Sequence, residues 1–234
     1  MKVGIIQSNY IPWRGYFDII DKVDLFVFHD DLQYTKDDWR NRNRILTDSG
    51  PQWLTIPCGK SEKRLICEVE LSDTSWQSKH WNMLMQHYRA APGFGQYSEF
   101  FESVYKKRGW SNLSDLNQFL ITEISRSFLG VKTEFLDSRE LGLTLRKGER
   151  VIEILEKVGA KSYLSGPSAK GYLESSMFAD RGIALEWMDY PEYMPYPQRF
   201  EGFEGFEGFV GDVSIVDLLL NLGDDAVTVA FQSA

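Results

Sequence analysis

The stretch "GIIQSNYIPWRGYF", residues 4–17, decides how the chain begins to fold. Residues 3–7 have the apolar, partly β-branched character of a buried strand, and residues 16–23 carry apolar side chains at helical spacing. Between the two lie amides, aromatic rings and a proline, which suit neither a core nor an ordinary solvated loop. The stretch therefore predicts a strand, a polar loop and a helix, with the loop at the carboxyl end of the strand.

The same alternation continues along the chain. Further strands are predicted at residues 24–30, 132–136, 161–165 and 183–190, and helices at residues 114–130, 148–160, 168–178 and 214–223. Strands this apolar need cover on both faces, which is the arrangement of a parallel sheet between helices. We therefore predict an α/β, Rossmann-like fold with a largely parallel sheet flanked by helices.

A second pattern interrupts this alternation. Residues 52–58 and 65–71 have the character of the two strands of an inserted β-hairpin with its turn at Gly59–Arg64, and helical spacing follows at residues 75–90 and 100–110. Because no linker separates these segments from the rest, we expect a single domain, residues 1–234, with an insertion at residues 50–115.

Composition limits the class of protein. The 234 residues carry a net charge of −8, which argues against a general nucleic-acid-binding surface, because such surfaces need clustered cations. No apolar run approaches the roughly 20 residues that cross a bilayer, and the pattern of a secretory signal is not visible at the N-terminus. The two cysteines do not make a disulfide framework. We expect a cytoplasmic protein that acts on a small molecule.

Polar loops follow three of the predicted strands, at residues 7–13, 29–44 and 165–170. Ligands of open α/β sheets bind beyond the carboxyl ends of the strands, so we expect these loops to gather on one rim. The third loop, "SGPSAKGYL", suits an anion, because the N–H groups of a helix start and the charge of Lys170 both favour it. A proline-initiated helix with a solvated lysine is the plainer alternative.

The segment "YTKDDWRNRNRI", residues 34–45, mixes basic, amide and aromatic side chains. If it is extended, its three arginines lie on one side and its two asparagines on the other; if it is helical, a lysine and two arginines form the stripe. Guanidinium groups beside Trp39 and Tyr34 suit planar anionic ligands through forked hydrogen bonds and stacking. The alternative is a surface loop in which Asp37 and Asp38 pair with the arginines.

His29 ends a predicted strand and is followed by Asp30 and Asp31. We expect it to titrate near neutral pH with a carboxylate partner, so His29 and Asp31 are the candidate catalytic residues. The two aspartates could instead hold a Mg²⁺ that carries a phosphate. The histidines and cysteines show no spacing of three or four convergent metal ligands, so no metal site is predicted, and no motif identifies a cofactor.

Several of these motifs together resemble the WbqC-like protein family over nearly the whole chain. They are "IIQSNYIPWRGYFDII", "DDLQYTKDDWRNRNRI", "WLTIPC", the helix with Trp76, His80, Trp81 and Tyr88, "YLSGPSAKGYL", "MDYPEY" with Gln198, and "SIVDLLLNLG". The resemblance implies a role in bacterial O-antigen or surface-polysaccharide biosynthesis, and one member of the family has been proposed to be a glycine transferase.

The resemblance also implies a set of substrate-binding residues. Two departures from the family pattern stand out: Ile6 takes the place of a frequent histidine, and a triple Phe-Glu-Gly repeat expands the segment after Gln198. The polar motifs of the family map onto Gln7, Asn9, Tyr10, Trp13, Asp31, Gln33, Tyr34, Lys36, Trp39, Arg40, Asn41, Arg42, Ser165, Gly166, Pro167, Tyr172 and Gln198.

Three functions are compatible with the sequence. The first is a transferase of surface-polysaccharide or nucleotide-sugar metabolism that forms an amide between glycine, or another small acyl group, and a nucleotide-activated or lipid-linked sugar. The second is a sugar- or nucleotide-binding protein without catalysis, since no decisive nucleophile is visible. The third is a Rossmann-like nucleotidyltransferase, although "YIPWRGYF" stands where that class has its HxGH motif.

Overall fold

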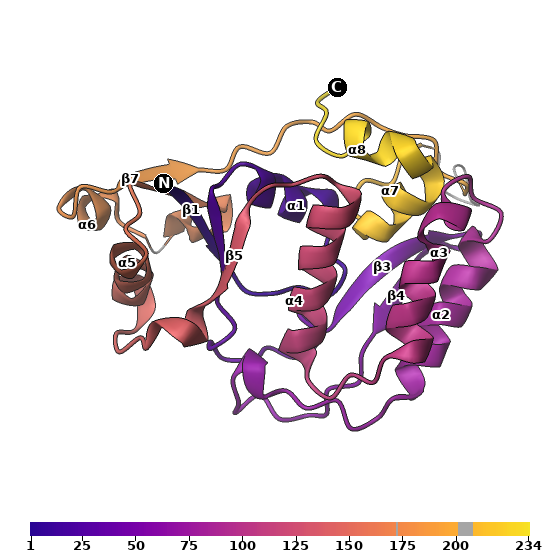
Figure 1. The fold of residues 1–234 in the computed structure, drawn as a ribbon, viewed down its shortest axis with the longest axis horizontal. Helices are drawn as coiled ribbons and strands as arrows, with labels where there is room; N and C mark the ends of the chain where they lie inside the picture. The colour runs from indigo at the N-terminus through magenta and orange to yellow at the C-terminus, as the bar shows by residue number, and fades with distance from the viewer. Residues whose placement is uncertain (172, 201–207) are drawn as a thin grey trace.

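The computed structural model describes residues 1–171, 173–200 and 208–234, and its centre is a parallel five-stranded sheet (Figure 1). The strands are β1 (Lys2–Ile6), β2 (Leu25–Phe28), β5 (Glu134–Asp137), β6 (Ser162–Ser165) and β7 (Ala184–Trp187). They are ordered β5-β2-β1-β6-β7, so the chain builds outward from β1 first in one direction and then in the other. The α/β fold predicted from the sequence is confirmed.

Helices cover both faces of this sheet because its strands are apolar on both faces. Val3 in β1 and Val27 in β2 pack toward α5 (Lys147–Lys157) and α6 (Ser175–Ala179). Phe26 and Phe28, the alternate residues of β2, pack on the opposite side toward α1 (Arg14–Asp21) and α4 (Leu113–Glu123). The two groups of helices lie on opposite sides of the sheet in Figure 1. Strands are added on one side of β1 up to β5 and on its other side from β6, so the boundary between β1 and β6 is the topological switch point, where ligands of such sheets bind.

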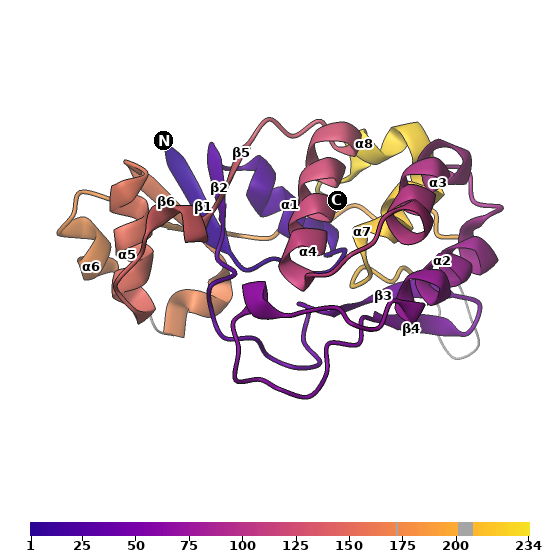
Figure 2. The ribbon, with the colours of Figure 1, turned by 60° about the horizontal axis from the view of Figure 1, so that its bottom comes forward.

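A two-stranded antiparallel hairpin lies to one side of the sheet (Figure 2). It consists of β3 (Arg42–Thr47) and β4 (Gly50–Thr55), and its tight turn relies on Gly50, whose φ is +89°. The predicted hairpin of residues 52–58 with 65–71 is therefore wrong: residues 52–55 pair with the arginine-rich segment instead. Residues 66–68 form a short 3₁₀ turn, η1 (Ile66–Glu68).

The remaining helices pack around the hairpin and at the ends of the sheet. Asn112 caps α4 by accepting a hydrogen bond from the N–H of Asp115, and Ser214 caps α7 in the same way. A continuous helix over residues 168–178 is not formed, because the chain passes through Gly171 as a 3₁₀ turn and begins α6 only at Ser175. The other elements are α2 (Ser75–Tyr88), α3 (Phe94–Glu102), α7 (Ile215–Leu222), α8 (Ala226–Val229), π-helical turns at Ser103–Lys107 and Ile124–Phe128, and 3₁₀ turns at Ser138–Leu141, Pro167–Gly171 and Gly223–Asp225.

Within the described residues, none of these helices combines the length and the apolar character needed to cross a membrane.

Candidate functional site

A pocket of about 420 Å³ opens at the carboxyl ends of β1 and β2, and we call it the strand-end pocket. Gln7 and His29, the residues that leave these two strands, line it together with Tyr163 of β6. Its other side is the start of α5, where Lys147 and Gly148 line the opening. Its full lining is Ile5, Ile6, Gln7, His29, Leu32, Lys147, Gly148, Val151 and Tyr163. The pocket thus lies at the edge of the sheet where the topology predicts a ligand.

His29 lies in a charged cluster at this pocket. The Arg150 side chain donates from Nε to His29 Nε2 at 3.1 Å and from Nη2 to the Asp31 carboxylate. The hydroxyl of Ser138 donates to the other oxygen of Asp31, which lies 3.7 Å from His29 Nε2. Because Nε2 accepts the bond from Arg150, the proton of the neutral imidazole is on Nδ1.

The pKa of His29 is lowered to about 4. Burial is the largest cause, because it penalises the imidazolium; Asp31 acts in the opposite direction, and the positive charge of Arg150 lowers the pKa further. The expectation that His29 titrates near neutral pH is therefore wrong, because burial and the charge of Arg150 together lower its pKa by more than Asp31 raises it. His29 is neutral throughout the physiological pH range.

Asp30 and Asp31 serve different partners despite being adjacent. Asp30 is buried and accepts hydrogen bonds from the N–H of Ser8 at 2.7 Å and from the side chains of Ser114 and Gln118. It therefore fixes the loop after β1 against α4.

Among the described residues, no group of three or more His, Cys, Asp or Glu side chains is placed to hold a metal ion.

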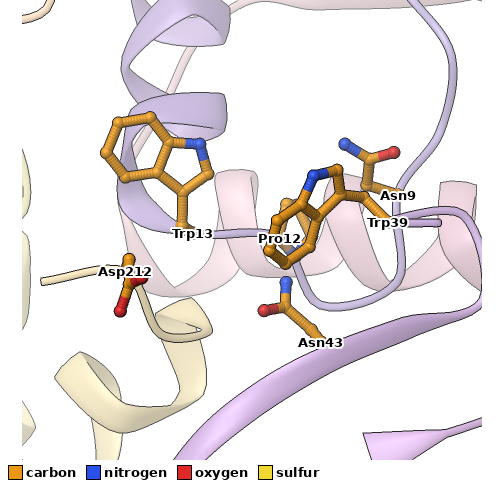
Figure 3. Close-up of a pocket in the computed structure, with 6 residues that line it drawn as sticks. All are labelled: Asn9, Pro12, Trp13, Trp39, Asn43 and Asp212. Carbon is orange, nitrogen blue, oxygen red and sulfur yellow. The ribbon is translucent and has the colours of Figure 1, made fainter. Parts of the chain in front are cut away.

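A second pocket of about 250 Å³ lies on the hairpin side of the same loop, and we call it the tryptophan pocket (Figure 3). In Figure 3 the indoles of Trp13 and Trp39 face the opening from separate segments, and Asn43 rises from β3. Trp13 lies against Tyr190 and Tyr193, with ring centroids 5.3 and 5.8 Å apart. The lining comprises Asn9, Pro12, Trp13, Trp39, Asn43 and Asp212.

Arg40 joins the two pockets. Its Nη1 donates to Asn9 Oδ1, in the tryptophan pocket, and its Nη2 donates to Gln7 Oε1, in the strand-end pocket, at 3.2 Å. The amide of Asn117 in α4 anchors the Arg40 carbonyl at 2.8 Å. Both partners of the guanidinium are neutral, and no described carboxylate lies within 4.0 Å of it. The positive charge of Arg40 thus lies between the two pockets without a direct ion pair, although it is close enough to help lower the pKa of Asp38.

The wall of the tryptophan pocket is a strained turn. Ile11 has a φ of +36°, which is rare for a β-branched residue, and such outliers cluster at functional sites. The buried side chain of Asn43 holds this turn by donating to the carbonyls of Tyr10 at 3.2 Å and Ile11 at 2.9 Å. The "RNRNR" segment is therefore extended only from Arg42 onward, because Arg40 and Asn41 lie in a turn, and both asparagines donate to backbone carbonyls that they hold in place.

Four of the predicted binding residues lie in the interior instead of at a pocket. Tyr10 hydrogen-bonds to His80 Nδ1 at 2.8 Å within the core. Tyr34 is fully buried beneath Arg64, and Asn41 donates to the carbonyl of Ile56. Gln198 is buried where it bonds both the backbone of Val210 and the Asp217 carboxylate. Tyr10 and Gln198 are held by hydrogen bonds within the fold, whereas the hydroxyl of Tyr34 and Oδ1 of Asn41 are shielded from solvent without a hydrogen-bond partner. The sequence motif therefore marks interior positions as well as positions that line a pocket.

The loop after β6 does not join the other two. Ser165, Gly166, Pro167 and Lys170 line none of the pockets described here, and the ammonium of Lys170 lies 5.7 Å from the ring centroid of Trp187. Tyr172 falls outside the described residues. Two further predicted residues are exposed: Lys36 pairs with Asp37 at 3.4 Å, and Gln33 forms a single backbone bridge with Leu65.

No sequence pattern marks Lys147 and Tyr163, which line the strand-end pocket, or Arg150, which bonds to His29 there. Arg150 lies in a helix with charged neighbours, so nothing in its local pattern distinguishes it from a solvated arginine. Its partner His29 is 121 residues away in sequence. Residues so far apart in sequence are brought together by the crossover from β5 to β6, which carries α5, and no local motif predicts their contact.

Comparison with known proteins supports a family assignment. The model of the WbqC-like protein family matches residues 7–229. The chain is 42% identical over 228 residues to the uncharacterized protein Rv1507c of Mycobacterium tuberculosis (strain ATCC 25618 / H37Rv), covering 96% of this chain and 95% of that one. No solved structure matches significantly. Since the family match spans nearly the entire chain, this protein belongs to the WbqC-like protein family.

Proposed function

We propose that this protein is a transferase of surface-polysaccharide or nucleotide-sugar metabolism that forms an amide between glycine, or another small acyl group, and the amino group of an activated sugar. The observation that carries the proposal is the pair of pockets joined by Arg40. One pocket has indole walls that suit a ring, and the other has a titratable cluster and a helix start that suit an anionic group and a proton transfer.

In this proposal each pocket binds one part of the reactants. Trp13 and Trp39 stack on the sugar ring or on the base of its nucleotide. Lys147 and the N–H groups at the start of α5 bind the phosphate or carboxylate, a role that the sequence alone assigned to the loop at Gly166. Arg40 contacts the ligand where the pockets meet, because its guanidinium bonds only the neutral side chains of Asn9 and Gln7 and makes no direct ion pair within the described residues.

The chemical step is an acyl transfer to an amine. The sugar nitrogen attacks the acyl carbonyl, a C–N bond forms, the bond from the acyl carbon to its leaving group breaks, and the nitrogen loses a proton. His29 accepts this proton at Nε2 when an anionic group of the ligand draws Arg150 away, and Asp31 stabilises the imidazolium that results. The neutral resting state of His29 is the state that a general base requires.

The experiment is a transfer assay read by mass spectrometry. Nucleotide-activated sugars with a free amine are incubated with the protein and a panel of acyl donors, and the mass gain of the sugar is followed. His29→Gln should abolish the mass gain while the affinity for the sugar stays within about threefold, and His87→Gln is the matched control because His87 lies on α2 against Phe200. Sugar binding without turnover for any donor in the wild type refutes the proposal.

A sugar- or nucleotide-binding protein without catalysis is the second candidate. It is favoured by the hydrogen bond that His29 Nε2 already accepts from Arg150, because this bond uses the lone pair that a general base needs to take up a proton. The same assay separates the two functions, because a binding protein has no turnover to lose when His29 is replaced.

A further inference from the structure

The β3–β4 hairpin and the turn that precedes it expose two large aromatic side chains, Trp53 of β4 and Trp39 of the turn. Trp39 and Trp53 are each 43% exposed, and their ring centroids lie 5.6 Å apart at an angle of 41°. Only five large hydrophobic side chains among the described residues are this exposed, and these two are in contact. Exposed indoles that gather in this way mark binding surfaces more often than isolated ones do.

Two arginines lie over the ring of Trp53. Arg42 and Arg44 are two residues apart in β3, so their side chains project from the same face. The guanidinium carbon of Arg42 lies 4.3 Å from the ring centroid of Trp53, and that of Arg44 lies 5.3 Å from it. Stacking therefore holds both guanidinium groups in place.

The two arginines differ in their partners. Arg44 pairs with Asp212 and also bonds its carbonyl. Arg42 has no described carboxylate within 4.0 Å, although its charge helps to lower the pKa of Asp38, and the Nε atoms of both arginines are shielded from solvent without an acceptor. The terminal N–H groups of Arg42 therefore have no direct partner among the described residues and can donate to a ligand.

These residues form a third pocket, of about 380 Å³, which we call the hairpin pocket. Its lining is Asp37, Asp38, Trp39, Arg42, Arg44 and Trp53. Trp39 also lines the tryptophan pocket, so a single indole separates the two. A ligand that extends past Trp39 therefore passes directly from one pocket into the next.

The charges of the hairpin pocket select the kind of ligand. Two aspartates and two arginines balance each other, and the Asp38 carboxylate is fixed by the hydroxyl of Thr35 and the N–H of Trp39, both at 2.7 Å. A diphosphate would meet two carboxylates here, which disfavours a nucleotide. A sugar ring has an apolar face for the indoles, and its hydroxyl groups can donate to Asp38 and accept from Arg42.

We propose that the hairpin pocket is a second sugar-ring subsite, so that the carbohydrate bound by this protein is an oligosaccharide of at least two rings. The first ring occupies the tryptophan pocket, and the next packs against the exposed part of Trp53 beside the donors of Arg42. The inference rests on the proposed function only in assigning a sugar to the tryptophan pocket, and it requires no turnover.

The test is binding on a glycan array that carries mono- to tetrasaccharides, with the hits measured by calorimetry and with UMP and UDP as nucleotide probes. We expect affinity to rise at least about tenfold from the monosaccharide to the matching di- or trisaccharide. Trp53→Ala and Arg42→Met should each remove this gain and leave the monosaccharide affinity unchanged. Trp187→Ala is the matched control, because that indole lies on β7 outside all three pockets.

The outcomes are distinguishable. An array on which no glycan binds, an affinity that does not grow with length, or a gain that survives Trp53→Ala overturns the subsite, and so does binding of UDP that depends on Trp53. A length-dependent affinity without acyl transfer supports the subsite and refutes the transferase alone. Circular dichroism checks that both variants are folded. We expect the fold to persist in Trp53→Ala, because the Trp53 side chain is exposed.

Discussion

Replacing Arg150 with methionine should raise the pKa of His29. In the wild type that pKa is about 4, because the imidazole is buried and Arg150 donates to its Nε2 at 3.1 Å. Methionine keeps much of the length of the side chain and removes its charge. The Asp31 carboxylate, 3.7 Å from His29 Nε2, then has no arginine to neutralise it and stabilises the imidazolium.

The magnitude follows from the distances. A unit charge 3 to 4 Å away contributes on the order of 4 kcal/mol at the effective dielectric constant of about 20 that suits protein sites. That energy corresponds to about a thousandfold change in proton affinity, and it predicts a pKa for His29 of about 6 or higher in the variant. Burial remains and opposes the change, so the pKa is not expected to exceed that of an exposed histidine by much.

The assay is an NMR titration of the ring Cε1–H signals of the three histidines, with His29→Gln used to assign the signal. Arg146→Met is the matched control, because Arg146 is exposed four residues earlier and has no part in the cluster. If His29 still titrates near 4 in Arg150→Met, desolvation alone sets its pKa and the assignment of Arg150 as its regulator is wrong.

Three further predictions concern packing and acid stability. Gly15→Ala places a methyl group within 2.3 to 2.7 Å of the Trp13 indole, so ligand affinity in the tryptophan pocket should fall severalfold while the fold persists, as checked by calorimetry. Gly93→Ala drives a methyl group to 2.4 Å from a backbone oxygen of α7 and should lower the free energy of unfolding by about 2 to 4 kcal/mol in urea, whereas Gly95→Ala, with open space around it, should not. Burial lowers the pKa of His80 to about 4. As the pH falls from about 6.5 to 4, the unfolded chain therefore binds a proton at His80 before the folded chain does, and the free energy of unfolding should decrease. The decrease should be less steep in His80→Gln.

The sheet could be predicted because its signals are local. Each strand of the parallel sheet is a short apolar run bounded by polar residues, and the cap at Asn112 and the glycine at 223 mark helix ends through neighbouring residues alone. Strand β3 could not be recognised in this way. Its one asparagine, Asn43, is buried, and its amide donates to the backbone carbonyls of Tyr10 and Ile11, more than 30 residues away in sequence. The start of this strand therefore has the composition of a surface loop.

The candidate site was predicted in part. Gln7 and His29 follow adjacent strands, and the parallel sheet brings them together for the reason anticipated from the sequence. Residues 165–170 follow β6 in the same sense, yet line none of the three pockets, because the start of α5 occupies the opening there. The contact between Arg150 and His29 forms because the chain crosses over from β5 to β6, and no short segment of sequence reveals that crossover.

The most direct measurement is an NMR titration of the protein with nucleotide-activated amino sugars that follows the indole N–H signals of Trp13 and Trp39 together with the ring of His29. If the strand-end and tryptophan pockets form one site across Arg40, a single ligand must move all three signals with one dissociation constant. Ligands that move the indoles and leave His29 unchanged, or that give two different constants, would show that the pockets are independent.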